Sequence, residues 1–261
     1  NQMTWFDSLP KIEIHLHLEG AIPFPALWEL IQKYGGNPSA PDLEALEKKF
    51  RYTNFQQFIE TWFWKNQFLR EYEDFTHIAH LTARDLANQN IRYAEIFYSP
   101  SSFVRKGLQV QELTQAIKKG FARVPEIKMA LIADLVRNVG PEVEMVVLEQ
   151  LKDVKKLGVI GIGIGGSEHE FPPEPFEKLF HRARELGFHT TAHAGEAGCG
   201  RGHGTSLVGS LAIGGVIPGE PRNRFSASAS SMPCVDSPSM ARSWSPGFRP
   251  ARHAGVSSIG V

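Results

Sequence analysis

The alternation of two kinds of segment constrains the fold of this chain most strongly. From Pro10 to about Glu196, short apolar runs rich in β-branched residues alternate with longer amphipathic stretches. The short runs predict strands over residues 12–18, 91–98, 128–135, 159–164 and 189–193. The longer stretches predict helices over residues 25–34, 54–69, 72–89, 110–124, 141–155 and 175–186, the last ending at Gly187. Strand, helix and strand at this spacing indicate a parallel sheet with crossover helices.

The repetition of this unit without a reversal selects between two α/β architectures. It favours a (β/α)8 TIM-type barrel over an open doubly wound sheet. The Gly-x-Gly-x-x-Gly turn of dinucleotide-binding doubly wound sheets is also absent after the first predicted strand. A barrel of eight strands needs about 250 residues. Only five predicted strands lie before residue 198. We therefore expect a barrel portion over residues 1–198, with an incomplete or irregular fold after it.

Residues 199–261 differ in composition from the rest of the chain. Ser, Gly, Pro, Arg and Ala dominate, no lysine follows Lys178, and the only acids are Glu220 and Asp236. Such a segment buries little apolar surface. Our hypothesis is that this segment results from a shifted reading frame or a truncation. Sequencing the coding DNA would test it, because an uninterrupted frame encoding this segment would contradict it.

Charge and composition bear on partners and location. The chain has 28 basic and 28 acidic residues, so no net field recruits nucleic acid or an acidic membrane surface. No apolar run reaches the roughly 18 residues of a membrane span, and no signal pattern opens the sequence. Cys199 and Cys234 do not form a disulfide framework, and we interpret them as free thiols. The expectation is a cytoplasmic protein with a small-molecule partner.

A pair of histidines ends the first predicted strand. Residues i and i+2 of a strand point to the same face, so His15 and His17 project together. In a parallel barrel the carboxyl ends of the strands form the catalytic mouth. Two imidazoles directed at one point suit a divalent transition metal, most often zinc, although an ordinary pair of surface or core histidines fits the pattern equally. Four apolar side chains are expected on the opposite, buried face: Ile12, Ile14, Leu16 and Leu18.

A second polar cluster ends the fifth predicted strand. It reads His193-Ala194-Gly195-Glu196, and its histidine would bring a third imidazole to the same mouth. Glu196 is not spaced like a ligand and suits a general acid or base beside a metal. Taken alone, the run fits a polar strand end with an ordinary surface glutamate better than a catalytic site. Both clusters together are hard to attribute to chance.

Three motifs resemble those of the adenosine deaminase family. They are residues 9–20 (LPKIEIHLHLEG), residues 93–100 (YAEIFYSP) and residues 191–198 (TAHAGEAG), which occur in the family's order and spacing. The resemblance covers about residues 9–198. It implies a zinc-dependent β/α barrel of the amidohydrolase type, with one zinc ion per chain. The implied reaction is the hydrolytic deamination of adenosine or a related aminopurine to an inosine-type product and ammonia.

The resemblance also implies roles for individual residues. His15, His17 and His193 match metal-ligand positions, and Glu196 matches the proton donor to the purine ring nitrogen beside the carbon under attack. The implied substrate-binding positions are a glycine after the fourth strand, an acid facing the ribose and an apolar lid over the base: Gly166, Glu19, Phe58 and Trp62. For the two lid residues, ordinary packing of their helix explains the sequence at least as well.

Several positions depart from the family's pattern. Residues 163–168 read GIGGSE where members usually have DLAGDE, so two carboxylates are lost and the substrate stays open to adenine or an altered nucleoside such as aminofutalosine. His203 is a candidate for the histidine that steers the attacking water, but it follows His193 by ten residues rather than about two dozen. Asp236 is a weak candidate for the family's metal-ligating aspartate, since no β-run precedes it.

Three functional hypotheses follow from these patterns. The first is a zinc deaminase acting on adenosine or another aminopurine. The second is a different amidohydrolase. The motifs at residues 98–100 and 193–196 favour the deaminase over this alternative. The third is a catalytically dead fragment of the family, which the unmatched metal-ligating aspartate favours.

Overall fold

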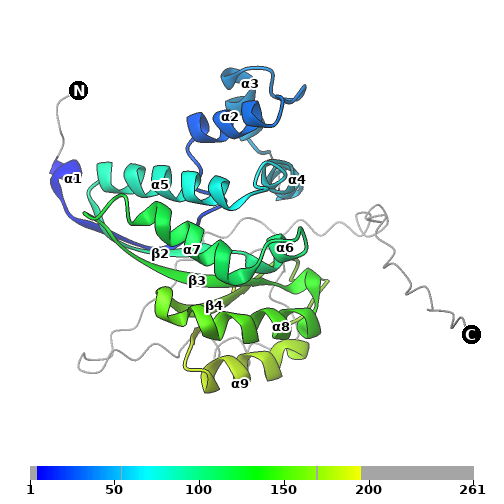
Figure 1. Cartoon of the computed structure of the whole chain (residues 1–261). Helices are drawn as coiled ribbons and strands as arrows, with labels where there is room; N and C mark the ends of the chain where they lie inside the picture. Colours follow the sequence, from blue (N-terminus) through cyan, green and yellow to red (C-terminus); the bar gives the residue numbers. More distant parts are fainter. Residues whose placement is uncertain (1–4, 54, 169, 195–261) are drawn as a thin grey trace, which may run out of the picture. The chain divides into compact units, whose positions relative to one another are not determined.

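The chain is built around a five-stranded parallel sheet with the order β1-β2-β3-β4-β5 (Figure 1). The structure is a computed structural model that describes residues 5–53, 55–168 and 170–194. The strands are β1 (Lys11–His17), β2 (Ile91–Tyr98), β3 (Lys128–Val136), β4 (Val159–Gly165) and β5 (His189–Thr190). Each strand pairs with the next one along the chain, as in one side of a β/α barrel. The predicted fold class is confirmed over this part of the chain.

The strand predictions agree with the structure to within a residue or two, except at the fifth strand. There β5 covers only His189 and Thr190. Two hydrogen bonds extend the ladder beyond it, because the amides of Thr191 and His193 donate to the carbonyl oxygens of Ile162 and Ile164 at 3.0 and 2.9 Å. The main chain at His193 is therefore still aligned on β4.

The described helices connect the strands in the predicted order. They are α1 (Trp5–Ser8), α2 (Phe24–Lys33), α3 (Leu43–Lys49), α4 (Phe55–Asn66), α5 (Tyr72–Asn88), α6 (Pro100–Val104), α7 (Val110–Phe121), α8 (Pro141–Leu151) and α9 (Glu177–Glu185), with 3-10 turns η1 (Arg137–Val139), η2 (Lys152–Leu157) and η3 (Glu174–Phe176). Three of them, α1, α3 and α6, are not among the predicted helices. They span only four to seven residues, too few to produce a clear 3.6-residue period.

Local sequence accounts for how several of these helices begin and end. Asp42 caps α3 by accepting a hydrogen bond from the amide of Ala45 at 2.7 Å. The predicted helix 141–155 is divided, with α8 followed by the tighter turn η2, which stops at Gly158 with φ of 93°. Gly187 follows α9 with φ of 75°, the left-handed conformation that glycine adopts at no steric cost.

Helices α5, α7, α8 and α9 pack one against the next along the sheet (Figure 1). Their apolar sides, together with the strands, form one buried cluster that includes Phe75, Ile117 and Leu148. Helices α5 and α7 approach closely at Gly120, where a Cβ atom would collide with the main chain and side chains of α5. This layer of helices fixes the sheet from one side and leaves the carboxyl ends of the strands to carry the site.

The prediction that β1 buries one apolar face is wrong for two of its four residues. Ile12 and Ile14 are 70% and 59% exposed, whereas Leu16 is partly buried and Leu18 fully buried. No described element covers Ile12 and Ile14, and the pairing of β1 with β2 is irregular between Lys11 and Ile12 and between Glu13 and Leu16. Alternation in the sequence identifies the apolar face, but burial also needs an element that covers it.

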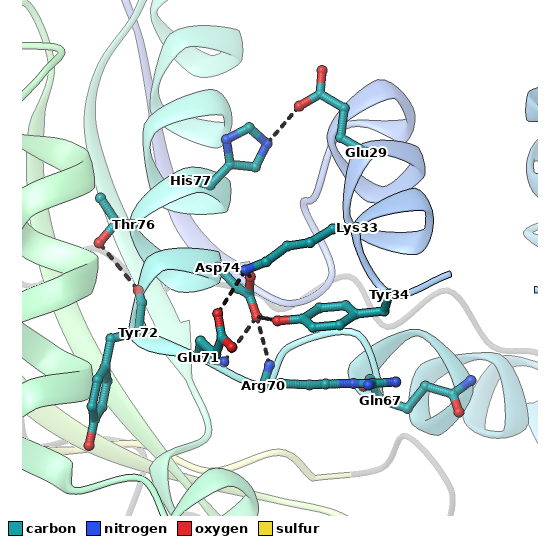
Figure 2. Close-up of polar contacts among 10 residues, drawn as sticks. All are labelled: Glu29, Lys33, Tyr34, Gln67, Arg70, Glu71, Tyr72, Asp74, Thr76 and His77. Atoms are coloured by element: carbon teal, nitrogen blue, oxygen red, sulfur yellow. Dashed lines mark hydrogen bonds and ion pairs between the residues drawn. The ribbon is translucent and has the colours of Figure 1, made fainter. Parts of the chain in front are cut away.

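A polar cluster joins α2 to the start of α5 (Figure 2). Asp74 is buried and accepts hydrogen bonds from Lys33 Nζ and the Tyr34 hydroxyl, both at 2.6 Å. It also accepts from the amides of Arg70 and Glu71, each at 2.9 Å, within a capping box at the N-terminus of α5. The Asp74 carboxylate thus accepts hydrogen bonds from main-chain amides at the N-terminus of α5 and also links α5 to the C-terminal end of α2.

Of the remaining sequence predictions, the one on membrane spans can be compared with the described residues. Among these residues, no helix combines the length and apolar character needed to cross a membrane. Cys199, Cys234 and the segment 199–261 lie outside the described part of the chain. The boundary near residue 198 and the interpretation of the cysteines stay predictions.

Candidate metal centre

Three histidines converge at the carboxyl ends of β1 and β5. The Nε2 atom of His15 lies 3.3 Å from that of His17 and 3.2 Å from that of His193, and the last two are 3.1 Å apart. Two of these residues come from one strand, and the third is 176 positions away from His17 in the sequence. The structure therefore brings together the three histidines that the sequence singles out.

Hydrogen bonds among the three rings cannot account for all three of these close contacts. Each Nε2 offers either one proton or one lone pair, so at most one of the three contacts is a hydrogen bond. A cation at the centre would satisfy all three lone pairs. Ligands at about 2.0 Å from a tetrahedral zinc lie roughly 3.3 Å from one another, close to the observed separations. The three imidazoles, which form the group of potential ligands found among the described residues, fit a transition metal.

Aromatic side chains hold the histidine rings in place. Phe97 of β2 stacks on His15 with centroids 4.3 Å apart and an angle of 13° between the rings. Trp62 of α4 meets the His17 ring edge-on at 5.8 Å, and Phe58 lies 5.9 Å from Trp62. Both candidate lid residues are therefore on the side of α4 that faces the histidine cluster.

A buried arginine holds the main chain of the third histidine. Arg137, only 2% exposed, donates from Nη2 to the carbonyl oxygen of His193 at 2.8 Å. Its Nη1 also lies 3.4 Å from the carbonyl oxygen of Phe171, in the segment after β4. Because the His193 amide is bonded to Ile164, both main-chain groups of this residue are fixed. Our sequence reasoning missed Arg137.

Asp134 is a second residue that our sequence reasoning missed. It lies on β3 and is 5% exposed, and its Oδ2 is 3.8 Å from Nδ1 of His17. A signal was present, since residues 129–136 read MALIADLV and contain a single charged residue in an otherwise apolar strand. Buried carboxylates need a partner, so an acid in such a run indicates a polar neighbour.

Glu19 is fully buried just beyond β1. Its Oε1 accepts a hydrogen bond from the amide of Ser99 at 2.9 Å, while Oε2 has no hydrogen-bond partner among the described residues. Burial raises the pKa of Glu19. Burial also lowers the pKa of Lys65 to about 7, although the Glu19 carboxylate opposes that shift. The Lys65 ammonium lies 3.6 Å from the centre of the Trp62 ring, so α4 carries both an aromatic and a cationic group near this carboxylate.

Gly166 occupies a position that only glycine tolerates. Its φ is +100°, and a Cβ atom there would come within 2.5 Å of Oδ1 of Asn138. The same Asn138 oxygen accepts a hydrogen bond from the amide of Ser167 at 3.0 Å. The tight turn after β4 explains this glycine on structural grounds, and contact with a substrate is a separate prediction.

Three candidate residues lie outside the described part of the chain. They are Glu196, His203 and Asp236. The described centre thus contains three nitrogen donors, and the predicted acid, the predicted water-steering histidine and the weak candidate for a carboxylate ligand stay predictions.

A parallel β/α sheet with three histidines clustered at the carboxyl ends of its strands is the arrangement expected of a β/α-barrel protein with a metal site at its catalytic mouth. Comparison with known proteins makes the assignment specific. The adenosine deaminase family model matches residues 10–202, and the chain belongs to this family. It is 33% identical over 197 residues to an adenine deaminase of Bordetella avium, and 32% identical over 195 residues to an adenine deaminase of Chlorobium luteolum.

These relatives are longer than the matched region. The Bordetella alignment covers 74% of this chain and 62% of the relative, and the Chlorobium alignment covers 73% and 57%. The chain therefore spans about three fifths of the length of the curated relatives it matches.

Solved structures support the same assignment. An adenine deaminase from Arthrobacter aurescens has a TM-score of 0.64 at 28% identity, over 72% of this chain and 58% of that one. An amidohydrolase from Burkholderia ambifaria, solved with bound zinc, has a TM-score of 0.66 at 32% identity, over 73% of this chain and 53% of that one.

Proposed function

We propose that this chain carries the metal-binding part of a zinc-dependent hydrolase that deaminates an aminopurine. The observation that carries this proposal is the convergence of three histidine Nε2 atoms within 3.3 Å of one another. Membership in the adenosine deaminase family supports the reaction type. The zinc bound in the related amidohydrolase supports the choice of metal.

The reaction replaces the amino group of a purine ring with oxygen from water and releases ammonia. His15, His17 and His193 would hold one zinc ion, which when bound supplies a water activated for attack near neutral pH. Glu196 is proposed to give a proton to the ring nitrogen beside the attacked carbon. His203 is a candidate for orienting the water.

The described residues suggest how an aminopurine would bind. Trp62 and Phe58 offer aromatic faces beside the histidine cluster, onto which a flat base can pack. Glu19 is fully buried, and its Oε2 has no hydrogen-bond partner among the described residues; we propose that a polar group of the substrate becomes its partner when the site is occupied. We propose Gly166 as a further substrate-binding position. It lacks a side chain in the turn after β4, so the main chain there is open to a ligand.

Adenine and adenosine are the two substrates to compare. The resemblance in the sequence motifs is to adenosine deaminases, whereas the curated relatives described above are adenine deaminases. Loss of two carboxylates from the segment 163–168 also separates this chain from the usual adenosine pattern. A free base is therefore the substrate that we would test first.

The test is to purify the full chain, load it with zinc, and follow the ultraviolet spectrum with adenine and with adenosine. Conversion of adenine to hypoxanthine, or of adenosine to inosine, supports the proposal and selects the substrate. The matched control is the His17→Ala variant, which we expect to abolish turnover. Bound zinc without turnover on either compound, or on a panel of other aminopurines, would contradict deamination and favour another amidohydrolase reaction. Neither zinc nor turnover would favour the inactive-fragment hypothesis.

A further inference from the structure

We propose that Asp134 is a positioning residue that orients the His17 imidazole for metal binding through the ring nitrogen opposite the metal. This inference rests on the metal centre of the proposed function. It assigns a role to a residue of β3 that none of the sequence motifs includes.

The position of the carboxylate is built into two neighbouring strands. Asp134 pairs in register with Gly163 of β4. A Cβ atom on Gly163 would come within 2.9 Å of Oδ1 of Asp134, and one on Gly165 within 3.0 Å of Oδ2. Larger residues at these positions would therefore crowd the carboxylate. The two glycines leave the space that it occupies.

Asp134 approaches His17 from the side of the imidazole that faces away from the triangle of Nε2 atoms. Its Oδ2 lies 3.8 Å from Nδ1 of His17, whereas Nε2 of the same ring belongs to the triangle. Among the described residues, the group of potential ligand atoms within 4.8 Å of one another comes from the three histidines. Asp134 is therefore placed to act on His17 rather than on the metal itself.

The chemistry of imidazole explains what this placement does. A neutral ring has one proton and one lone pair on its two nitrogens, so a lone pair on Nε2 requires the proton on Nδ1. A carboxylate beside Nδ1 favours that tautomer. At 3.8 Å the attraction is Coulombic, because the distance exceeds that of a hydrogen bond. A cation held on Nε2 would make the ring more positive and strengthen this attraction.

Asp134 also acts on a second part of the centre. Its negative charge attracts the Arg137 guanidinium, the group that donates to the carbonyl oxygen of His193. The Asp134 carboxylate thus interacts with His17 directly and with the main chain of His193 through Arg137. Such outer partners typically change metal affinity 10- to 100-fold when they are removed.

The test measures zinc affinity of the full chain by competition with a chromophoric chelator. We expect Asp134→Ala to weaken zinc binding by about 10- to 100-fold, and Asp134→Asn, which keeps the size and one acceptor, to weaken it less. Asp153→Asn is the matched control, because Asp153 is exposed on η2 and we expect no change. The Co²⁺ absorption spectrum should also change in the Asp134 variants, since it reports the ligand field.

Thermal unfolding of the metal-free proteins separates positioning from a general effect on folding. A positioning role predicts that added zinc raises the melting temperature of the Asp134 variants by less than it raises that of the wild type. Zinc affinity within twofold of wild type, with an unchanged Co²⁺ spectrum, would overturn the role of Asp134 and leave the metal centre intact. A wild-type chain that binds no zinc would overturn both proposals.

Discussion

At the scale of single residues, several charged side chains are buried in the interior of this chain, where apolar side chains would pack at lower cost. Asp134, Arg137 and Glu144 are all at least 95% buried; Asp134 lies on β3, Arg137 directly follows it, and Glu144 lies on α8. Burying charge is costly unless it is paired or hydrogen-bonded. Asp134 and Arg137 lie against His17 and His193, so the proposed metal centre would explain the cost of burying them. Glu144 instead accepts a hydrogen bond from the amide of Val136 at 2.8 Å, at the end of the same strand.

Glu144 gives a prediction about the dependence of stability on pH. Burial raises the pKa of its carboxyl from 4.5 to about 7. The neutral acid therefore stabilises the fold fully below about pH 4.5, and this contribution is lost as the pH rises through 7. We expect the free energy of unfolding of Glu144→Gln, relative to wild type, to improve by about 2 kcal/mol between pH 5 and pH 8.

Urea unfolding of both proteins at the two pH values measures this difference. Glu142→Gln is the matched control, because Glu142 is exposed in the first turn of the same helix, and we expect no such trend. A Glu144→Gln effect that is the same at both pH values would show that the acid does not change its ionisation in this range.

At the scale of helices and strands, the junction of α2 and α5 depends on one carboxylate. Burial alone would raise the pKa of Asp74, but hydrogen bonds from Lys33 and Tyr34 outweigh burial and lower it. The resulting stabilisation is present above about pH 3.8, the ordinary value, and is lost as the pH falls through the lower folded value. We expect Asp74→Ala to reduce the free energy of unfolding by about 2 kcal/mol at pH 7, since it removes a cap and leaves four partly buried donors without this acceptor.

Chemical unfolding at pH 7 and at pH 3 measures this loss, with Glu73→Ala as the control. Glu73 is the exposed neighbour in the same helical turn. The difference between Asp74→Ala and wild type should shrink at pH 3. Equal stability of Asp74→Ala and wild type at pH 7 would contradict the account of this junction.

The sequence predicts the long elements well because their periods are long enough to read. Strand β2 matches its predicted range of 91–98 at both ends, and α5 ends one residue before its predicted end at residue 89. The short helix α6 and the exposure of Ile14 were not predicted. The first depends on five residues that follow a strand. The second depends on which element covers β1, and no residue in β1 encodes this.

At the scale of the whole molecule, the site divides into residues that a local pattern identifies and residues that only the fold brings together. His15 and His17 are two positions apart on a strand, so strand geometry alone aligns them. His193 is distant in the sequence, and only the motif at residues 191–198 indicates that it belongs to the same site. Asp134 comes from a strand about 117 positions after His17 in the sequence, and nothing in either strand's local pattern indicates that the two side chains are within 4 Å of each other.

Zinc stoichiometry of the full chain tests the central claim most directly. Metal analysis after dialysis against trace zinc should give about one zinc per wild-type chain. It should give much less for His15→Ala, His17→Ala and His193→Ala, because each substitution removes one corner of the nitrogen triangle. His181→Ala, an exposed histidine of α9, should retain the metal. A wild-type chain without zinc, or variants of the triangle that bind as much zinc as the wild type, would contradict the metal centre.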